Sequence, residues 1–278
     1  MKRYLAGVLC VLIVVFSTAC FAAETETSAN SGNILTMAVA WKQTAAEYQA
    51  LYYQAFNIAK VKIDQALANK QEGGKPLCII TDVDDTIMLH NDYWGYLISN
   101  DYDFFDDPIW DVRVPTNTCT AAPGSLDLLK YCEENGVEVF YVTNRNQGDG
   151  TYQMAIDNLN ALSFPYVDTD HVIVQIETSN KETVQTEIAE KYEVILMMGD
   201  NLNDFKRAYY VSDVDERIAL MEADKQLFGD RFILLPNPTD GHWIRAIFGD
   251  SEPPASGENR QIWKDAATRT IWDSGLAE

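Results

Sequence analysis

The sequence predicts an α/β fold in which helices cover both faces of an open parallel sheet. Five short apolar runs lack the alternation of polar and apolar residues found in half-exposed strands, which is typical of parallel strands buried on both faces. Helical stretches separate most of these runs, and alternation of strand and helix favours a parallel sheet. The five runs are Leu77–Thr81, Val137–Thr143, His171–Ile176, Val194–Met198 and Phe232–Leu235.

The helices are predicted from the spacing of apolar residues. From Ile34 to about Asn69 apolar side chains recur at helical spacing, which indicates one long helix or a pair of helices before the first strand. The segment Gln71–Pro76 then breaks the pattern. Later helices are expected over Pro123–Asn135, Thr151–Ala161, Lys181–Lys191 and Asp213–Leu227.

The chain divides into regions of different composition. Its 278 residues suit one large domain with a small insert. We expect a signal peptide at 1–19, a flexible tether at 20–33, the α/β domain at 34–248 and a polar extension at 249–278. An aromatic, acidic stretch at about 87–120 is expected to form a cap beside the site. Its segment Asp101–Asp107 lacks the Gly and Glu of a calcium loop, so we interpret it as a solvated acidic loop.

The N-terminus has the pattern of a bacterial export signal. A basic start precedes the apolar run Tyr4–Phe16, and small residues lead to Cys20. Small residues before a cysteine are similar to a lipobox, in which Cys20 would carry the lipid of an envelope lipoprotein. Two alternatives are an ordinary signal cut near Ala22 and a retained anchor over 4–23, about long enough to span a bilayer. All three place the body of the protein outside the cytoplasm, in the bacterial cell envelope or secreted.

The charge of the chain limits its partners. It carries 42 acidic and 21 basic residues, a formal net charge of −21. Such acidity argues against a broad surface for nucleic acid or for anionic membranes. An anionic substrate would therefore need positive charge imported into its site, most simply as a metal ion. The three His residues are too few for a His-rich metal site.

Cysteine usage fits export only weakly. Cys10 and Cys20 belong to the signal region, and the absence of CxxC spacing argues against zinc. Cys78 falls in an apolar run and is expected to be an inert buried thiol. Cys119 and Cys132 are left, and a bond between them in an oxidising compartment is an open alternative.

Two acidic clusters follow predicted strands and carry the strongest functional signal. Asp82 and Asp84 leave the end of the first strand, while Asp200 and Asp204 follow the fourth, where Gly199 permits the turn. In an open α/β sheet this edge binds ligands. Because buried carboxylates without a partner are costly, a cation between them is expected, and hard oxygen ligands favour Mg²⁺.

Polar residues at two further strand ends complete the constellation. Thr143, Asn144 and Arg145 end the second strand with a hydroxyl, an amide and a cation. Lys181 opens the helix after the third strand, at the strand end that faces the site. Lys191 is its near rival, but it ends the same helix, where a cation complements the helix dipole. We therefore expect Lys181 to be the lysine of the site.

Together these residues resemble the four motifs of the haloacid-dehalogenase-like (HAD-like) phosphohydrolases, which implies a HAD-like Rossmannoid sheet. The motif residues are Asp82-Val-Asp84-Asp85-Thr86, Thr143, Lys181, Asp200 and Asp204. Longer stretches resemble the class C acid phosphatases, bacterial envelope proteins that are often lipoproteins and are also called outer-membrane lipoprotein 5′-nucleotidases. These stretches are Phe140–Arg145, Gly199–Phe205, Phe232–Asn237 and Gly241–Trp243, and the resemblance covers about Ile34 to Phe248.

The resemblance implies a role for each motif residue. Asp82 would attack phosphorus as the nucleophile and form an aspartyl-phosphate. Asp84 would protonate the leaving alcohol and then activate water, so its side chain should point away from the metal. Thr143 and Lys181 would hold the phosphoryl oxygens.

The resemblance also implies a set of metal ligands. Mg²⁺ would be held by the carboxylates of Asp82 and Asp200 and by the backbone carbonyl of Asp84, with Asp204 ordering the water shell. Arg145 and Asn144 are expected to reach the substrate, although a salt bridge on the sheet rim is an equal alternative for Arg145.

The resemblance implies one aromatic contact to the substrate. At the position of the family's second aromatic residue, this sequence has a different residue type. In the family an aromatic residue of the insert pairs with one just before the Gly-x-Trp motif, and Trp110 matches the first by approximate spacing. Asp240 occupies the second position, so the aromatic sandwich is missing or rebuilt with His242 or Trp243.

These observations predict a Mg²⁺-dependent acid phosphatase that hydrolyses small phosphomonoesters, 5′-nucleotides among them. An acidic optimum is expected because Asp84 must be protonated to serve as acid. A catalytically silent surface protein for binding or adhesion and a phosphotransferase using the same site are the alternatives. Expected partners are small phosphomonoester substrates and a membrane reached through a lipid on Cys20, without any nucleic-acid polymer; a homodimer is a further option.

Overall fold

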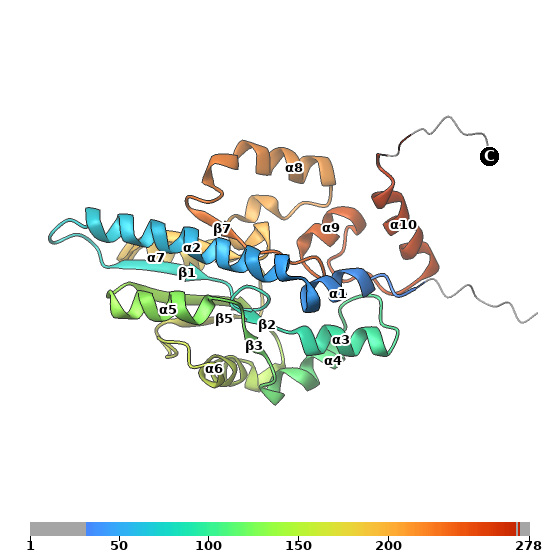
Figure 1. The fold of residues 1–278 in the computed structure, drawn as a ribbon, viewed down its shortest axis with the longest axis horizontal. Coiled ribbons are helices and arrows are strands. Elements are labelled where there is room, and N and C mark those ends of the chain that lie inside the picture. The colour runs from blue at the N-terminus through green and yellow to red at the C-terminus, as the bar shows by residue number, and fades with distance from the viewer. Residues whose placement is uncertain (1–31, 271, 273–278) are drawn as a thin grey trace, which may run out of the picture. The chain divides into compact units, whose positions relative to one another are not determined.

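The sheet predicted from the apolar runs is present. A computed structural model describes residues 32–270 and 272. Five parallel strands form one sheet in the order β5-β4-β1-β6-β7, and helices surround it (Figure 1). The strands are β1 (Leu77–Thr81), β4 (Glu138–Asn144), β5 (Val172–Gln175), β6 (Glu193–Gly199) and β7 (Phe232–Leu234). Strand β1 therefore occupies the centre, with β4 and β6 as its neighbours.

Helices fill the connections between strands at the predicted places. The longer helices are α1 (Thr36–Thr44), α2 (Ala46–Asn69), α5 (Ser125–Glu134), α6 (Thr151–Ala161), α7 (Glu182–Lys191) and α8 (Val214–Ala223). The segment before the first strand is a pair of helices, because Ala45 takes an extended conformation with ψ of 122° between α1 and α2. The helix expected to reach Leu227 ends earlier, and a short 3₁₀ turn over Lys225–Leu227 follows it.

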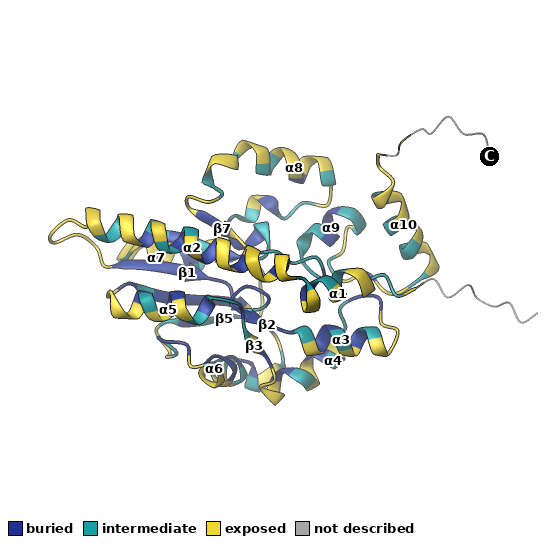
Figure 2. Ribbon diagram, in the orientation of Figure 1, coloured by how far each residue is buried: buried dark blue, intermediate teal, exposed yellow. Residues whose placement is uncertain are grey.

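The two faces of the sheet build separate apolar cores. Along β1, Ile79 packs with residues of α2 and α5, whereas Cys78 and Ile80 pack on the opposite face with Ile188 of α7. Successive side chains of a strand point to opposite faces, so a strand buried on both sides needs the continuous apolar run seen in the sequence. Figure 2 shows the buried strands beneath helices whose outer faces are exposed.

The cap is a small helical unit. It contains β2 (Met88–Leu89), α3 (Asn91–Ser99), α4 (Asp107–Arg113) and β3 (Thr120–Ala121), with β2 and β3 paired antiparallel. Its aromatic side chains Tyr93, Trp94 and Trp110 form a buried cluster with Leu35 and Val39 at the N-terminal end of the described chain. The cap is thus held to α1 as well as to the sheet.

The interpretation of Asp101–Asp107 as a solvated loop is wrong for two buried residues, Asp103 and Phe104. Asp103 is only 1% exposed, and Arg260 donates from Nε to its Oδ2 at 2.7 Å. Arg260 belongs to α10 (Gly257–Ala267), a helix inside the polar C-terminal extension. A distant cation that covers the carboxylate cannot be seen from local composition, and this pair ties the extension to the cap.

The structure tests the predictions about the cysteines but not those about the N-terminus. Cys78, Cys119 and Cys132 are buried free thiols, so the alternative bond between Cys119 and Cys132 is not formed. The predicted signal peptide, most of the predicted tether and Cys20 lie outside the described residues. Within 32–270, every helix is too short or too polar to cross a bilayer.

Candidate active site

The loop after β1 places the first two predicted carboxylates at the carboxyl edge of the sheet. The backbone N–H of Asp82 donates to the carbonyl of Met198 on β6 at 2.9 Å, which continues the sheet pairing to this residue. The carbonyl of Val83 then accepts from the N–H groups of Thr86 and Ile87, so the chain turns at once. Because of this turn, the side chains of Asp82 and Asp84 point in different directions.

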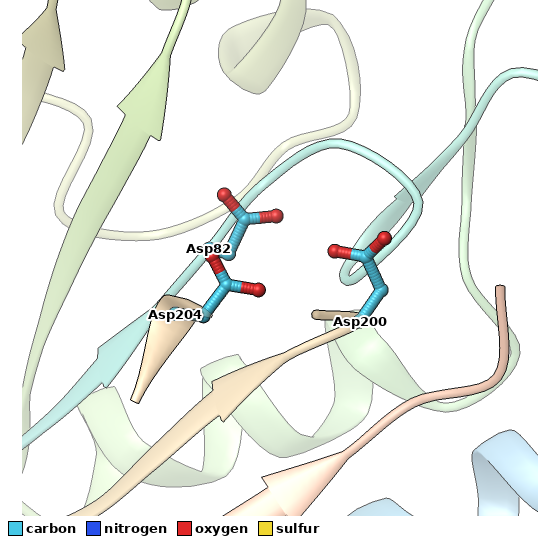
Figure 3. A group of neighbouring side chains, drawn as sticks. All are labelled: Asp82, Asp200 and Asp204. Carbon is cyan, nitrogen blue, oxygen red and sulfur yellow. The ribbon is translucent and has the colours of Figure 1, made fainter. Parts of the chain in front are cut away.

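Asp82, Asp200 and Asp204 form a cluster of three carboxylates. One oxygen from each lies within 4.8 Å of the others, and Figure 3 shows the three side chains pointing toward one another. Gly199 makes the close packing feasible, because a Cβ at this position would collide with the side chain of Asp204. Two chain segments that are far apart in sequence therefore meet at one edge, as predicted.

Hydrogen bonds hold each carboxylate of the cluster. Lys181 lies between two of them, bonded to Asp82 and 2.8 Å from Oδ1 of Asp204. Thr86 donates from Oγ1 to Asp82 at 2.9 Å and is 3.2 Å from Asp200. The amide of Asn237 donates to Oδ2 of Asp200 at 2.7 Å. The sequence analysis identified Lys181 but not Asn237, whose position after β7 is again a strand end.

The electrostatics of the cluster favour a bound cation. Burial raises the pKa of Asp82; Lys181 opposes this effect, while the neighbouring carboxylates add to it. Burial and the charges of Asp204 and Asp82 raise the pKa of Asp200 well above its usual range. Three carboxylates share one buried site with a single lysine, so a hard divalent ion fits this all-oxygen donor set.

Asp84 lies in a different environment, turned away from the cluster. Arg145 forms a two-pronged contact with it, from Nε at 2.8 Å and from Nη2 at 2.6 Å. The ring of His90 lies 2.7 Å away through Nε2, and Thr143 donates from Oγ1 at 3.2 Å. Burial alone would raise the pKa of Asp84, but the charge of Arg145 and the contact with His90 outweigh it and hold this pKa well below its usual range.

The other predicted residues line the cavity that contains the carboxylate cluster. Trp110 packs edge-on against His90 with 4.6 Å between ring centres, and Arg145, only 4% exposed, also donates to Asn158. The amide of Asn144 donates to the carbonyl of Thr178. Of the two alternatives for Arg145, the salt bridge is therefore made, and its partner is Asp84.

Lys42 is a buried residue of the site region that the sequence analysis did not identify. Its Nζ lies 2.8 Å from Oδ2 of Asp85 and 2.9 Å from Oγ1 of Thr239. Leu35, Val39 and Lys42 are spaced at i, i+4 and i+7, so Lys42 occupies the inward face of the predicted helix. A charged residue at such a position signals a buried partner, which is how sequence reasoning could have found it.

A parallel sheet with clustered carboxylates at its carboxyl edge, a lysine between them and a second, separately held aspartate defines a HAD-like phosphohydrolase. A model of the HAD superfamily, subfamily IIIB (acid phosphatase), matches residues 15–243. The chain belongs to this family and is a phosphomonoester hydrolase.

Solved structures agree with this assignment. Two structures of the class C acid phosphatase from Bacillus anthracis, one of them with tungstate bound, are each 30% identical to this chain with a TM-score of 0.79. Each alignment covers 87% of this chain and 99% of the other. The resemblance to class C acid phosphatases inferred from the motifs is thereby confirmed.

Proposed function

We propose that the protein is a Mg²⁺-dependent acid phosphatase that hydrolyses small phosphomonoesters, 5′-nucleotides among them, through an aspartyl-phosphate on Asp82. The observation that carries this proposal is the cluster of Asp82, Asp200 and Asp204 beside a separately held Asp84. When bound, a divalent ion would shield the repulsion between the Asp82 carboxylate and the anionic phosphoryl group. The carboxylates of the cluster would hold it, with Asp84 contributing its backbone carbonyl.

The residues of this chain divide the chemistry between them. The carboxylate of Asp82 attacks phosphorus as the ester P–O bond breaks, and Asp84 gives a proton to the departing alcohol oxygen. Asp84 then takes a proton from water as the water oxygen attacks the phosphoryl group, which returns Asp82 and releases phosphate. Lys181 and Thr143 would donate hydrogen bonds to the phosphoryl oxygens.

The largest expected effect comes from removing the nucleophile. We expect Asp82→Asn to lower phosphatase activity by about 10³-fold or more, because a neutral amide cannot form the acyl-phosphate. Phosphate release from p-nitrophenyl phosphate and from 5′-nucleotides measures this, with Asp127→Asn on the exposed face of α5 as the matched control. Wild-type activity should vanish in EDTA and return with Mg²⁺. Full activity of Asp82→Asn would overturn the assignment of Asp82.

Hydrolysis and phosphotransfer use the same residues, and only the acceptor differs. Product analysis in the presence of an added alcohol separates them, because a transferase would form a new phosphate ester. No structural observation favours the silent binding protein, since the nucleophile and its neighbours are all present.

We infer that the protein is exported to the bacterial envelope and anchored through a lipid on Cys20. The basic start, the apolar run and the small residues before Cys20 support this. Mass analysis of the mature N-terminus in the native host tests it. A first residue of Cys20 with an added lipid mass is expected, and an unmodified terminus near Ala22 would refute lipidation.

A further inference from the structure

The cavity above the carboxylate cluster continues outward into a second acidic region. Its volume is about 290 Å³, and its lining includes Asp107, Asp240 and Glu252, here called the mouth carboxylates. Asp107 begins α4 in the cap, Asp240 precedes α9 (His242–Phe248), and Glu252 lies between α9 and α10. Asp107 and Glu252 are exposed and Asp240 half-buried, whereas Asp82 is only 9% exposed, so the mouth lies on the outer side.

The mouth carboxylates have no cationic partner among the described residues. Both permanent cations that line the cavity are bound deeper, Lys181 by Asp82 and Asp204 and Arg145 by Asp84. His242 also lines the cavity, but burial lowers its pKa to about 4, so it is neutral near neutral pH. No described cation of the lining therefore pairs with a mouth carboxylate, and the pKa of Asp240 is lowered only by the backbone of Gly241 and by the charge of Lys42.

The like charges at the mouth act on one another. Burial, together with the charge of Asp85, raises the pKa of Asp240 to about 6. Burial and the neighbouring Asp107 and Asp240 raise the pKa of Glu252 to about 7. A positive group placed between them would relieve this repulsion.

Two independent features of the same cavity also favour a cation. Trp94, Phe105 and Trp110 line the cavity. Trp94 already faces the ammonium of Lys42, 5.2 Å from its ring centre, and the half-buried Phe105 offers a further ring, whose face would attract an ammonium group when little water is present. Asp85 is 5% exposed and lines the cavity, yet its Oδ1 has no hydrogen-bond partner while Oδ2 receives Lys42 and Trp94. The outer cavity thus combines unpaired carboxylates with aromatic rings.

We propose that the mouth selects phosphomonoesters whose leaving alcohol carries a positive charge, such as an amino alcohol or a quaternary ammonium alcohol. This substrate class rests on the proposed function, because the phosphoryl group must lie at Asp82. The reaction remains hydrolysis: the ester P–O bond breaks, Asp84 protonates the alcohol oxygen, and water supplies the oxygen that returns phosphate to solution. The mouth carboxylates hold the cationic end and take no part in bond making.

The experiment compares two esters that differ by one charge. Phosphocholine and its neutral carbon analogue 3,3-dimethylbutyl phosphate have nearly the same shape, and p-nitrophenyl phosphate reports the basal chemistry. With Mg²⁺ present at pH 8, where Asp240 and Glu252 are ionised, kcat/KM for phosphocholine should exceed that of the analogue by about tenfold, a size consistent with one well-placed charge interaction. Added NaCl should reduce the ratio, because salt screens charges at an open mouth.

Variants locate the origin of the preference. The double variant Asp240→Asn/Glu252→Gln should bring the ratio close to one, whereas Glu190→Gln, an exposed residue of α7, should leave it unchanged. If the analogue is hydrolysed as well as phosphocholine while p-nitrophenyl phosphate is still turned over, the substrate class is wrong and the phosphatase assignment survives. If none of the three esters is hydrolysed, the proposed function itself fails.

Discussion

The cavity has an inner floor, formed by Asp82, Asp84, Asp85, Asp200 and Asp204, and an outer mouth. Both are acidic, but their charges are balanced differently. At the floor, Asp84 is paired with Arg145, Asp85 with Lys42, and Lys181 serves both Asp82 and Asp204. At the mouth, Asp107, Asp240 and Glu252 lack such partners among the residues that the structure describes. The floor is built from strand ends, whereas the mouth is built from the cap and the connections around α9. The sheet therefore holds the reacting groups, and the cap and the connections around α9 select the leaving group.

The same contrast occurs within the floor, between Asp82 and Asp84. They are two residues apart, yet the pKa of Asp82 is raised by burial among carboxylates and that of Asp84 is lowered by Arg145 and His90. In pairs of carboxylates that divide the nucleophile and acid–base roles, the acid has the raised pKa. Here the order is reversed, and the proposed divalent ion would lower the pKa of Asp82. In the proposed mechanism Asp82 lies on the side of the divalent ion and Asp84 on the side of the leaving group.

Breaking one floor pair should cost more than any change at the mouth. Lys42→Met leaves the carboxylate of Asp85 buried without its cation, so we expect a loss of about 3 kcal/mol in the free energy of unfolding. Chemical denaturation measures this loss. Lys60→Met, which removes an exposed pair with Asp64, should cost much less.

A second variant tests the pairing argument for Lys42. Lys42→Met/Asp85→Asn should recover part of the loss, because no charge is then left alone. If Lys42→Met and Lys60→Met lowered the free energy of unfolding equally, the buried pair of Lys42 and Asp85 would stabilise the protein no more than an exposed pair does.

Arg145 tests whether the floor positions Asp84 or binds the substrate. Because its guanidinium is held on Asp84, we expect Arg145→Gln to lower kcat by about 10²-fold through misplaced acid–base catalysis, with KM little changed. Steady-state kinetics on p-nitrophenyl phosphate separate the two parameters, with the exposed Arg231→Gln as control. A large rise in KM at unchanged kcat would instead assign Arg145 to substrate binding.

The smallest effect is expected at the mouth and should depend on pH. The pKa of Asp240 is raised from 3.8 to about 6, so the folded chain binds this proton more tightly than the unfolded chain. Its contribution to stability is therefore present below about pH 4 and is lost as pH rises toward 6. Asp240→Asn should stabilise the protein by about 1 kcal/mol at pH 7, after allowance for solvent screening, and by nothing at pH 4.

Thermal unfolding in EDTA at the two pH values measures this effect of Asp240. A gain for Asp240→Asn that is the same at pH 4 and pH 7 would contradict the linkage to its titration.

Local patterns in the sequence determined the sheet, most of its helices and the carboxylates of the floor. A strand buried on both faces must be apolar throughout, and ligands of a parallel sheet gather where strands end, so short-range order was sufficient to predict Asp82, Asp200, Asp204 and Lys181. The partners of the remaining charges were decided only by the tertiary structure. Lys42 reaches Asp85, Arg260 covers Asp103, and Asp107 joins Asp240 at the mouth, each across a long stretch of chain. Coulomb interactions depend on distance in space and on burial, and neither quantity is written in a local pattern of residues.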